Sequence, residues 1–330
     1  MLALWDTKGS EVVKKLAAER RNTGGGASGL ALTVVAIVDD ARIREVEEAA
    51  TIAASAHPCR LLVISRGPVS GPDPETANAK DRLDAEIIVG GRLGPCEAVI
   101  MRMHGRLALH AESIVMPLLA PDVPVVTWWH GPPPERLAFD PLGVVAERRV
   151  TDISQCADPA ASLMQRAVDY APGDTDLAWT RLTGWRALLA SALDTGSTEV
   201  RDAMVTGSVQ DPGTALLRGW LTSRLGIGTR LAEAPALTAV ELELADGSHI
   251  GVRTLGDGTA LVSRTGVGDR ILPLIKRRLG DDLAEELRRL DPDQPYGWAL
   301  QAATGIADLN DRPAVRTHVW QDPALVGVRR

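Results

Sequence analysis

The sequence predicts an α/β protein. We expect an N-terminal domain with a mostly parallel sheet and a smaller C-terminal α+β domain with an antiparallel sheet, joined by a long helix. Three observations support this prediction. Continuous apolar segments alternate with helical patterns up to about residue 170. A long amphipathic helical pattern follows them. Beyond it, short segments of alternating polarity are separated by Asp-Gly turns.

Residues 1–29 are interpreted as one helix followed by a glycine-rich connector. Apolar side chains recur with helical spacing from Lys8 to Asn22, and glycines end this pattern. Gly24, Gly26 and Gly29 spell GxGxxG, the phosphate-binding fingerprint of dinucleotide-binding folds. That motif requires a strand before it and a helix after it, whereas here the order is reversed. We therefore interpret the glycines as a flexible connector.

Residues 30–170 predict the α/β domain. The run from Leu30 to Val38 is continuously apolar, which is typical of a strand covered on both faces. Helical and strand-like segments then alternate, which favours a mostly parallel sheet. The expected strands are 30–38, 60–65, 85–89, 98–103, 123–127 and an edge strand at 144–152, and the expected helices are 42–56, 107–119 and 159–169.

Residues 171–197 predict the helix that joins the two domains. From Thr175 to Asp194 the apolar side chains, Trp185 among them, fall on one stripe of a helix. Asp176 suits the positive end of the helix dipole, and Gly196 suits a C-terminal stop. We interpret Trp185 as a packing residue.

Residues 198–330 predict the α+β domain. The Asp-Gly pairs at 246–247 and 257–258 separate short alternating segments and predict two hairpins. The last two helices are expected to cover one face of the antiparallel sheet. The expected strands are 200–205, 239–244, 250–254 and 260–263, and the expected helices are 212–225, 272–290 and 295–304.

Charge and hydropathy narrow the class of partner. The 330 residues carry a net charge of −7, so no overall positive field favours nucleic acid or an anionic membrane. The longest apolar runs are far below the roughly 20 residues that cross a bilayer. No basic segment followed by an apolar signal core begins the chain. We therefore expect a cytoplasmic protein with no nucleic-acid and no membrane partner.

The aromatic and basic residues are unevenly distributed. Eight Trp stand against two Tyr and one Phe, and Lys contributes five of the 36 basic side chains. A genome rich in guanine and cytosine would produce both biases. Trp and Arg are also the residues most enriched at binding hot spots, so their positions in the chain matter.

The segment Trp128-Trp129-His130 is the first candidate for a functional surface. It ends a predicted parallel strand, and α/β domains bind ligands or partners at such ends. Neighbouring residues of a strand face opposite ways, so we expect one Trp in the core and the other on a partner-binding surface. Trp179 and Arg181, on the flank of the predicted joining helix, are second candidates.

Other motifs have weaker functional interpretations. His57-Pro58-Cys59-Arg60 could hold a Cys/His nucleophile pair or metal ligands, with the remaining ligands drawn from His104, His110, Cys96 and Cys156. We favour a structural role, with the proline ending a helix and the arginine starting a strand. The three cysteines are too widely spaced for a CxxC site and are expected to be reduced.

The arginine pairs at 277–278 and 288–289 could bind phosphate, but a solvated face explains them better. No hydrolase, zinc-protease or kinase motif occurs. We therefore assign no catalytic residue, cofactor or metal, and we expect no enzymatic activity.

An ordered set of segments resembles the actinobacterial form of the glucose-6-phosphate dehydrogenase assembly protein family, OpcA. The similarity spans most of the chain. The segments that carry it are Leu4–Thr7, the glycine-rich entry to Leu32–Val35, His57–Arg60, Asp122–Val125 through Trp128-Trp129, Asp176–Leu182 with Trp185-Arg186, and Gly219–Leu221 with Arg224–Gly226.

The resemblance implies a non-catalytic cytoplasmic protein. It would bind oligomeric glucose-6-phosphate dehydrogenase, promote its assembly or active form as an allosteric effector, and control the oxidative pentose phosphate pathway. In its photosynthetic members, the family that this chain resembles is linked to redox control through cysteines. The alternative is an α/β enzyme or a nucleotide- or sugar-phosphate-binding module, because an α/β sheet hosts many unrelated functions.

Overall fold

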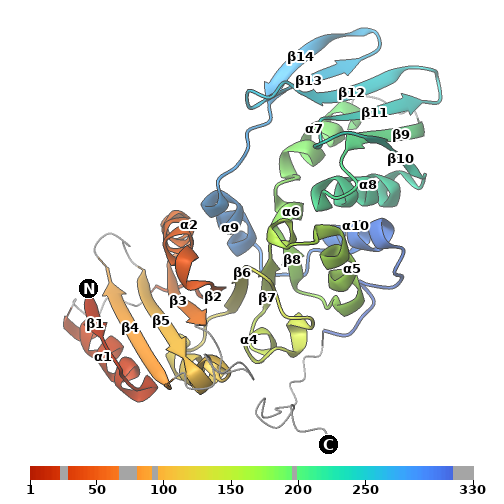
Figure 1. Cartoon of the computed structure of the whole chain (residues 1–330). Coiled ribbons are helices and arrows are strands. Elements are labelled where there is room, and N and C mark those ends of the chain that lie inside the picture. The colour runs from red at the N-terminus through yellow and green to blue at the C-terminus, as the bar shows by residue number, and fades with distance from the viewer. Residues whose placement is uncertain (23–28, 67–79, 91–95, 195–198, 315–330) are drawn as a thin grey trace, which may run out of the picture. The chain divides into compact units, whose positions relative to one another are not determined.

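The computed structural model describes residues 1–22, 29–66, 80–90, 96–194 and 199–314 (Figure 1). These residues divide into two compact units. The first contains Met1–Thr151 and Leu279–Asp291, and the second contains Asp152–Arg278 and Pro292–Ala314. Each unit has its own hydrophobic core.

The first unit is built on a mostly parallel sheet, which confirms the predicted class of this region. Its strands follow the order β1-β4-β5-β3-β2-β6-β7. The five strands from β5 to β7 in this order are parallel, whereas β4 and β1 are antiparallel to their neighbours. The strands are β1 (Leu2–Leu4), β2 (Leu32–Val38), β3 (Cys59–Arg66), β4 (Arg82–Val89), β5 (Glu97–His104), β6 (Val125–His130) and β7 (Arg148–Thr151).

One helix of this unit is shorter than the sequence pattern predicts. The helix expected over residues 107–119 is α-helical over five residues only, with 3-10 turns on both sides. Pro117 lies in the second of these turns and has no backbone N–H to continue the helix. The helices are α1 (Gly9–Asn22), α2 (Ile43–Ala56), α3 (Ala111–Val115), α4 (Pro141–Val144) and α9 (Leu279–Arg288).

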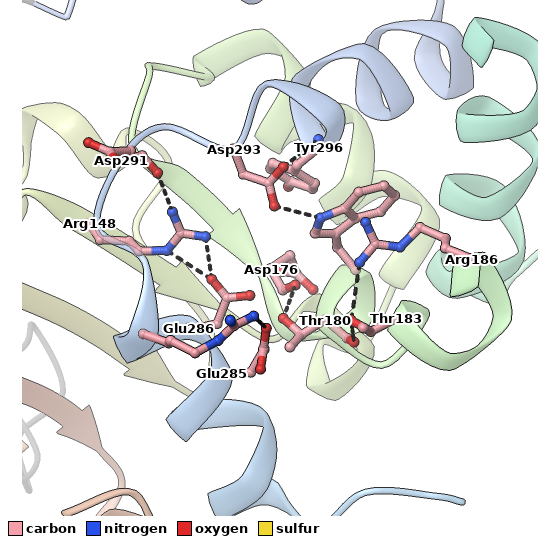
Figure 2. Close-up of polar contacts among 12 residues, drawn as sticks. Arg148, Asp176, Thr180, Thr183, Arg186, Glu285, Glu286, Asp291, Asp293 and Tyr296 are labelled. Atoms are coloured by element: carbon pink, nitrogen blue, oxygen red, sulfur yellow. Dashed lines mark hydrogen bonds and ion pairs between the residues drawn. The ribbon is translucent and has the colours of Figure 1, made fainter. Parts of the chain in front are cut away.

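Helix α9 joins the first unit although it lies far along the chain. It packs closely on α2, and the contact depends on Gly280. A Cβ built on this glycine would lie only 2.6 Å from the Cβ of Ile52. A buried ion pair adds to this contact, with the Arg148 guanidinium of β7 donating to the Glu286 carboxylate at 2.8 Å and to the Asp291 carbonyl at 2.9 Å. Figure 2 shows Arg148 between these two partners.

The second unit is built on a six-stranded sheet in the order β10-β9-β11-β12-β13-β14. The sheet is mixed rather than antiparallel, because β9 and β10 are parallel and joined through a helix. Gly247 and Gly258 have φ of +81° and +84° in the two Asp-Gly turns, so both predicted hairpins are confirmed. The strands are β9 (Val200–Gly207), β10 (Thr229–Glu233), β11 (Ala239–Leu244), β12 (His249–Thr254), β13 (Thr259–Arg264) and β14 (Val267–Pro273).

The prediction of a helix over residues 272–290 is wrong in two respects: the helix begins later, and it belongs to the other unit. Leu272 pairs with Ala260 in the sheet, so the first residues of the expected helix end β14. The helix itself begins at Leu279 as α9 and belongs to the first unit, so it does not cover this sheet. The strands β10 and β14 were also not anticipated.

The continuous helix expected over residues 175–194 is also wrong. Residues Asp174–Asp176 form the short strand β8, and Asp176 caps the next helix by accepting a hydrogen bond from the Ala178 N–H at 2.8 Å. The helix is then interrupted, and the Thr183 hydroxyl donates to the Thr180 carbonyl at 2.6 Å at the break. Both resulting helices, α6 (Leu177–Thr180) and α7 (Thr183–Asp194), belong to the second unit.

The remaining helices of the second unit cover its sheet in layers. Helix α8 lies between the sheet and α10 (Figure 1). Its close contact with α10 depends on Gly219, where a Cβ would lie 2.1 Å from the Ala299 carbonyl oxygen. The helices are α5 (Pro159–Asp169), α8 (Pro212–Leu225) and α10 (Gln294–Thr304).

Candidate functional site

The carboxyl ends of β2 and β6 lie side by side in the first unit. From β2 the chain passes through α2 to β3 on one side of β2, and it later places β6 on the other side. Open α/β sheets bind ligands at such switch points, outside the carboxyl ends of the strands. The register pairs Val38 with His130, so Asp39 and Gly131 are the first residues beyond the paired strands.

A pocket of about 250 Å³ lies at this edge of the sheet, and we call it the strand-end pocket. Gly131 turns the chain there with φ of +146°, which L side chains rarely adopt. Three prolines follow and form a rim of restricted φ. The lining residues are Ile37, Val38, Asp39, Arg66, Trp129, His130, Gly131, Pro132, Pro133 and Pro134.

Both tryptophans of β6 are buried, with exposed fractions of 0% for Trp128 and 2% for Trp129. The expectation that one of them lies on an exposed surface is therefore wrong. Central strands of a parallel sheet are covered on both faces, and every residue of β6 is buried. Trp129 nevertheless lines the strand-end pocket, so the two tryptophans differ in their surroundings.

His130 is also buried, and it is anchored by a carboxylate from α2. Its Nε2 lies 3.1 Å from Glu45 Oε2. Partial burial opposes ionisation of Glu45, but hydrogen bonds from His130 and Arg42 outweigh it and lower the pKa of this carboxyl. The pair joins the end of β6 to the first turn of α2 and so holds one wall of the pocket.

Acidification is expected to weaken the His130–Glu45 pair. Because the folded pKa of Glu45 lies below its ordinary value of 4.5, the pair stabilises the fold above that pH, and this stabilisation is lost as the pH falls through the lowered pKa. Glu45 is half exposed, so the contribution should stay below about 1 kcal/mol. Urea unfolding of wild type and Glu45→Gln should differ at about pH 7 and converge at about pH 3. A difference that does not change with pH would contradict this account.

Arg66 and Asp140 add charge near the pocket. Burial raises the pKa of Asp140, while the Leu142 N–H and the positive charge of Arg66 act in the opposite direction. The Asp140 carboxylate accepts from that N–H at 2.9 Å and caps α4. Arg66 lies at the end of β3 and lines the pocket.

The second candidate pair lies in the second unit, and Trp179 is buried with an exposed fraction of 1%. It does not lie on an open flank. Its indole N–H donates to Asp293 at 2.9 Å, and the Arg186 guanidinium stacks 3.6 Å from its ring centroid. Figure 2 shows Asp293, which also caps α10 at Tyr296, together with Arg186. Trp179 therefore has a structural environment.

Arg181 is held by a bidentate ion pair. Its guanidinium donates to both carboxylate oxygens of Asp152, at 2.8 and 2.6 Å, and to the Ser154 hydroxyl at 3.0 Å. This arrangement fixes the segment before α5 against the break between α6 and α7. The role of the five candidate residues in binding a partner stays a prediction. The Arg181 side chain is 32% exposed, whereas the other four are buried, and their direct contact with a partner would require their surroundings to open.

The His57–Arg60 segment has structural contacts within the first unit. A ring nitrogen of His57 lies 3.1 Å from the Ala284 carbonyl of α9. Arg60 is buried and donates to Glu97 at 2.7 Å and to the Leu118 carbonyl at 2.7 Å. These contacts support the structural interpretation.

The thiols of Cys59 and Cys96 lie next to each other, and both cysteines are reduced and buried, whereas Cys156 is reduced and partly buried. The Cys59 N–H donates to Cys96 Sγ at 3.3 Å. The hydrogen bond from Cys59 lowers the pKa of Cys96 to about 7, whereas the Cys59 pKa is raised.

Three further expectations concern the glycine-rich connector, metal binding and membrane spans. Gly24 and Gly26 of the glycine-rich connector lie outside the described residues. Within the described ranges, no group of three His, Cys, Asp or Glu side chains could hold a metal ion. Within the same ranges, no helix is long and apolar enough to span a membrane.

Two family models match the chain in succession. The first, described as the glucose-6-phosphate dehydrogenase subunit N-terminal domain of OpcA, matches residues 50–168. The second, described as the corresponding C-terminal domain, matches residues 172–300. The chain belongs to the OpcA family.

Curated OpcA relatives match about half of the chain. A putative OxPP cycle protein OpcA from Synechococcus elongatus is 30% identical over 184 residues, which are 53% of this chain and 41% of that relative. A protein of the same description from Nostoc punctiforme is 25% identical over 182 residues, or 51% of this chain and 38% of the relative. The matched stretch thus spans about two fifths of these OpcA relatives.

A solved structure described as an oxidoreductase from Sinorhizobium meliloti is also similar. It has a TM-score of 0.36 and 11% identity, and the match covers 86% of this chain and 90% of that one. A likeness at this level adds nothing to the OpcA assignment.

Asp39, Arg66 and Gly131 were missed as site residues of this OpcA chain. Each follows or ends a buried strand, and polar residues directly after apolar strands are the signal that could have identified them. Which strand ends meet depends on strand order, and that order is not a local property of the sequence.

Proposed function

We propose that this chain is a non-catalytic, cytoplasmic assembly partner and allosteric activator of oligomeric glucose-6-phosphate dehydrogenase, and that it thereby controls entry to the oxidative pentose phosphate pathway. One observation carries the proposal: two OpcA models, both described as domains of a glucose-6-phosphate dehydrogenase subunit, match consecutive parts of the chain. The curated relatives are described as OxPP cycle proteins, which supports the same role.

The physical requirement on such an effector is modest. A binding partner shifts an equilibrium only by the difference between its affinities for the two states. A tenfold shift toward the active dehydrogenase requires a difference of about 1.4 kcal/mol. A few well-packed side chains at an interface supply that much.

The exposed surface that best suits a protein partner is the outer edge of the mixed sheet. The strand β14 is the last in the sheet, and its outer edge has no paired strand in the part of the chain that the structure describes. Ile271 is 64% exposed there and Val267 is 46% exposed. Open edges with exposed apolar side chains pair readily with another chain.

The variant Ile271→Asp tests this surface. We expect it to weaken binding to the cognate dehydrogenase about tenfold or more, because a charge replaces an apolar contact in a desolvated interface. Folding should be little affected, since the side chain is already exposed. Val209→Asp is the matched control, because Val209 is 58% exposed elsewhere in the same unit. Equal binding by both variants would remove β14 from the interface.

The test of function is the activity of the purified cognate dehydrogenase as this chain is added. We expect activity to rise and saturate, and the proportion of the active oligomer to rise with it. Activity and oligomeric state that stay unchanged at all concentrations would exclude the proposed role. Conversion of a substrate by this chain alone would instead favour the enzyme alternative.

A further inference from the structure

Cys59 and Cys96 lie side by side where two neighbouring strands of the parallel sheet begin, and we call them the cysteine pair. Cys59 is the first residue of β3, and Cys96 directly precedes β5. The register pairs Arg60 with Glu97, so the cysteines occupy the preceding row of the sheet. Figure 1 shows β3 and β5 next to each other. The cysteine pair is therefore placed by the register of the sheet.

The Cys96 sulfur is directed toward Cys59. It accepts a hydrogen bond from the Cys59 N–H at 3.3 Å, and the Cys96 thiol donates to the Ala54 carbonyl at 3.6 Å. The two thiols also hydrogen-bond to each other. Each cysteine has an exposed fraction of 2%, so packing holds this contact in place.

The separation of the two backbones suits a disulfide. Neighbouring strands lie about 4.8 Å apart, and disulfides join residues whose Cα atoms are about 4.4–6.8 Å apart. Because the two thiols already touch, an S–S bond can form by rotation of the side chains and a small approach of the strands. Cross-linking the pair therefore does not require the fold to rearrange.

The two sulfurs differ in how firmly they hold a proton. The hydrogen bond from Cys59 lowers the pKa of Cys96 to about 7, although burial acts in the opposite direction. The contact with Cys96 and burial both raise the pKa of Cys59. Near pH 7 about half of the molecules therefore carry a Cys96 thiolate beside a Cys59 thiol. The thiolate is the form that reacts with oxidants.

We propose that the cysteine pair is a dithiol site that hydrogen peroxide converts to a disulfide, with Cys96 reacting first and Cys59 closing the bond. The Cys96 thiolate attacks one peroxide oxygen and breaks the O–O bond, which leaves a Cys96 sulfenic acid and, after uptake of one proton, a water. The Cys59 sulfur then attacks the Cys96 sulfur, and the sulfenic oxygen leaves as a second water with the Cys59 proton. The two thiols lose two electrons, and these reduce the peroxide.

Burial affects the rate and the product of this reaction. Peroxide reaches the sulfurs through local opening of the unit, so we expect a slower reaction than at an exposed thiol. The neighbouring Cys59 traps the sulfenic acid before a second peroxide arrives, so the product should be a disulfide and not a sulfinic acid. This inference goes beyond the proposed function and does not require that the chain bind the dehydrogenase.

Peptide mapping of the folded, full chain after peroxide treatment tests the proposal. Remaining thiols would be alkylated in denaturant before digestion. We expect a peptide that joins Cys59 to Cys96, lost on treatment with dithiothreitol. Cys156→Ser is the matched control, because it removes a partly buried thiol of the second unit and should still give the joined peptide. In Cys59→Ala, a Cys96 sulfenic acid should instead be trapped by dimedone.

Three results of this mapping would overturn the proposal. The first is that no peptide joins Cys59 to Cys96 under conditions that oxidise Cys156. The second is that the joined peptide forms only after urea has unfolded the chain, since the fold would then not supply the geometry. The third is that dimedone labels Cys59 in Cys96→Ala as fast as it labels Cys96 in Cys59→Ala.

The pH dependence of disulfide formation gives a second measurement. The rate should rise with pH and reach half of its maximum at about pH 7, because the Cys96 thiolate then accounts for about half of the molecules. In Cys59→Ala the same midpoint, followed by dimedone labelling of Cys96, should move to higher pH because the hydrogen-bond donor is lost. An unchanged midpoint in this variant would contradict the assigned contact between the thiols.

Discussion

Glu286→Ala is expected to lower the free energy of unfolding of the first unit by about 3–5 kcal/mol. The substitution leaves the Arg148 guanidinium buried and without its carboxylate, and an unpaired buried charge costs far more than the pair contributes. Helix α9 is held to β7 by this pair, so amides of α9 should lose most of their protection from hydrogen exchange.

Two controls separate the buried charge from simple loss of a side chain. Glu285→Ala removes a neighbouring carboxylate that pairs with Arg288, and it should cost less than about 1 kcal/mol because the Arg288 side chain is 52% exposed. The double variant Arg148→Met with Glu286→Leu should recover much of the loss, since apolar residues of similar size replace both charges. A double variant as unstable as Glu286→Ala would show that the ion pair is not the cause.

Gly219→Ala is expected to destabilise the second unit by about 2–3 kcal/mol. Alanine favours a helix over glycine by about 1 kcal/mol, yet its Cβ would lie 2.1 Å from the Ala299 carbonyl oxygen and 2.9 Å from the Ala303 nitrogen. Both atoms belong to the backbone of α10, so α8 and α10 must move apart. Amides of α10 should exchange faster in this variant.

Gly228→Ala is the matched control for this prediction. Gly228 has no atom within 4 Å of its built Cβ, and its φ lies outside the left-handed region. Its replacement should change stability by less than about 0.5 kcal/mol. Equal loss in the two variants would mean that general glycine effects, and not the contact between helices, explain Gly219.

The parts of the fold that the sequence predicted have strong local signals. The apolar run at Leu32–Val38 and the Asp-Gly turns each specify a strand or a hairpin within a few residues. The failures arose where distant residues decide the outcome. Leu272 lies in a strand because it pairs with Ala260. Helix α9 belongs to the first unit because it packs on α2 and its Glu286 pairs with Arg148.

The candidate site shows the same division. The sequence placed Trp128, Trp129 and His130 at a strand end, and the structure shows them there. It could not show that both indoles are buried, because coverage of both faces depends on packing by the rest of the unit. The sequence also could not show that Arg66 lines the same pocket, because this depends on the order of β3, β2 and β6 in the sheet.

The central claim, that this OpcA-family chain binds glucose-6-phosphate dehydrogenase, is tested most directly by the mass of the mixture. The purified chain of 35.1 kDa and its cognate dehydrogenase would be mixed and measured by light scattering after size exclusion. We expect a single species that contains both chains and exceeds the mass of the dehydrogenase oligomer alone. Two separate species with the masses of the unmixed proteins, at concentrations well above those in the activity test, would contradict it.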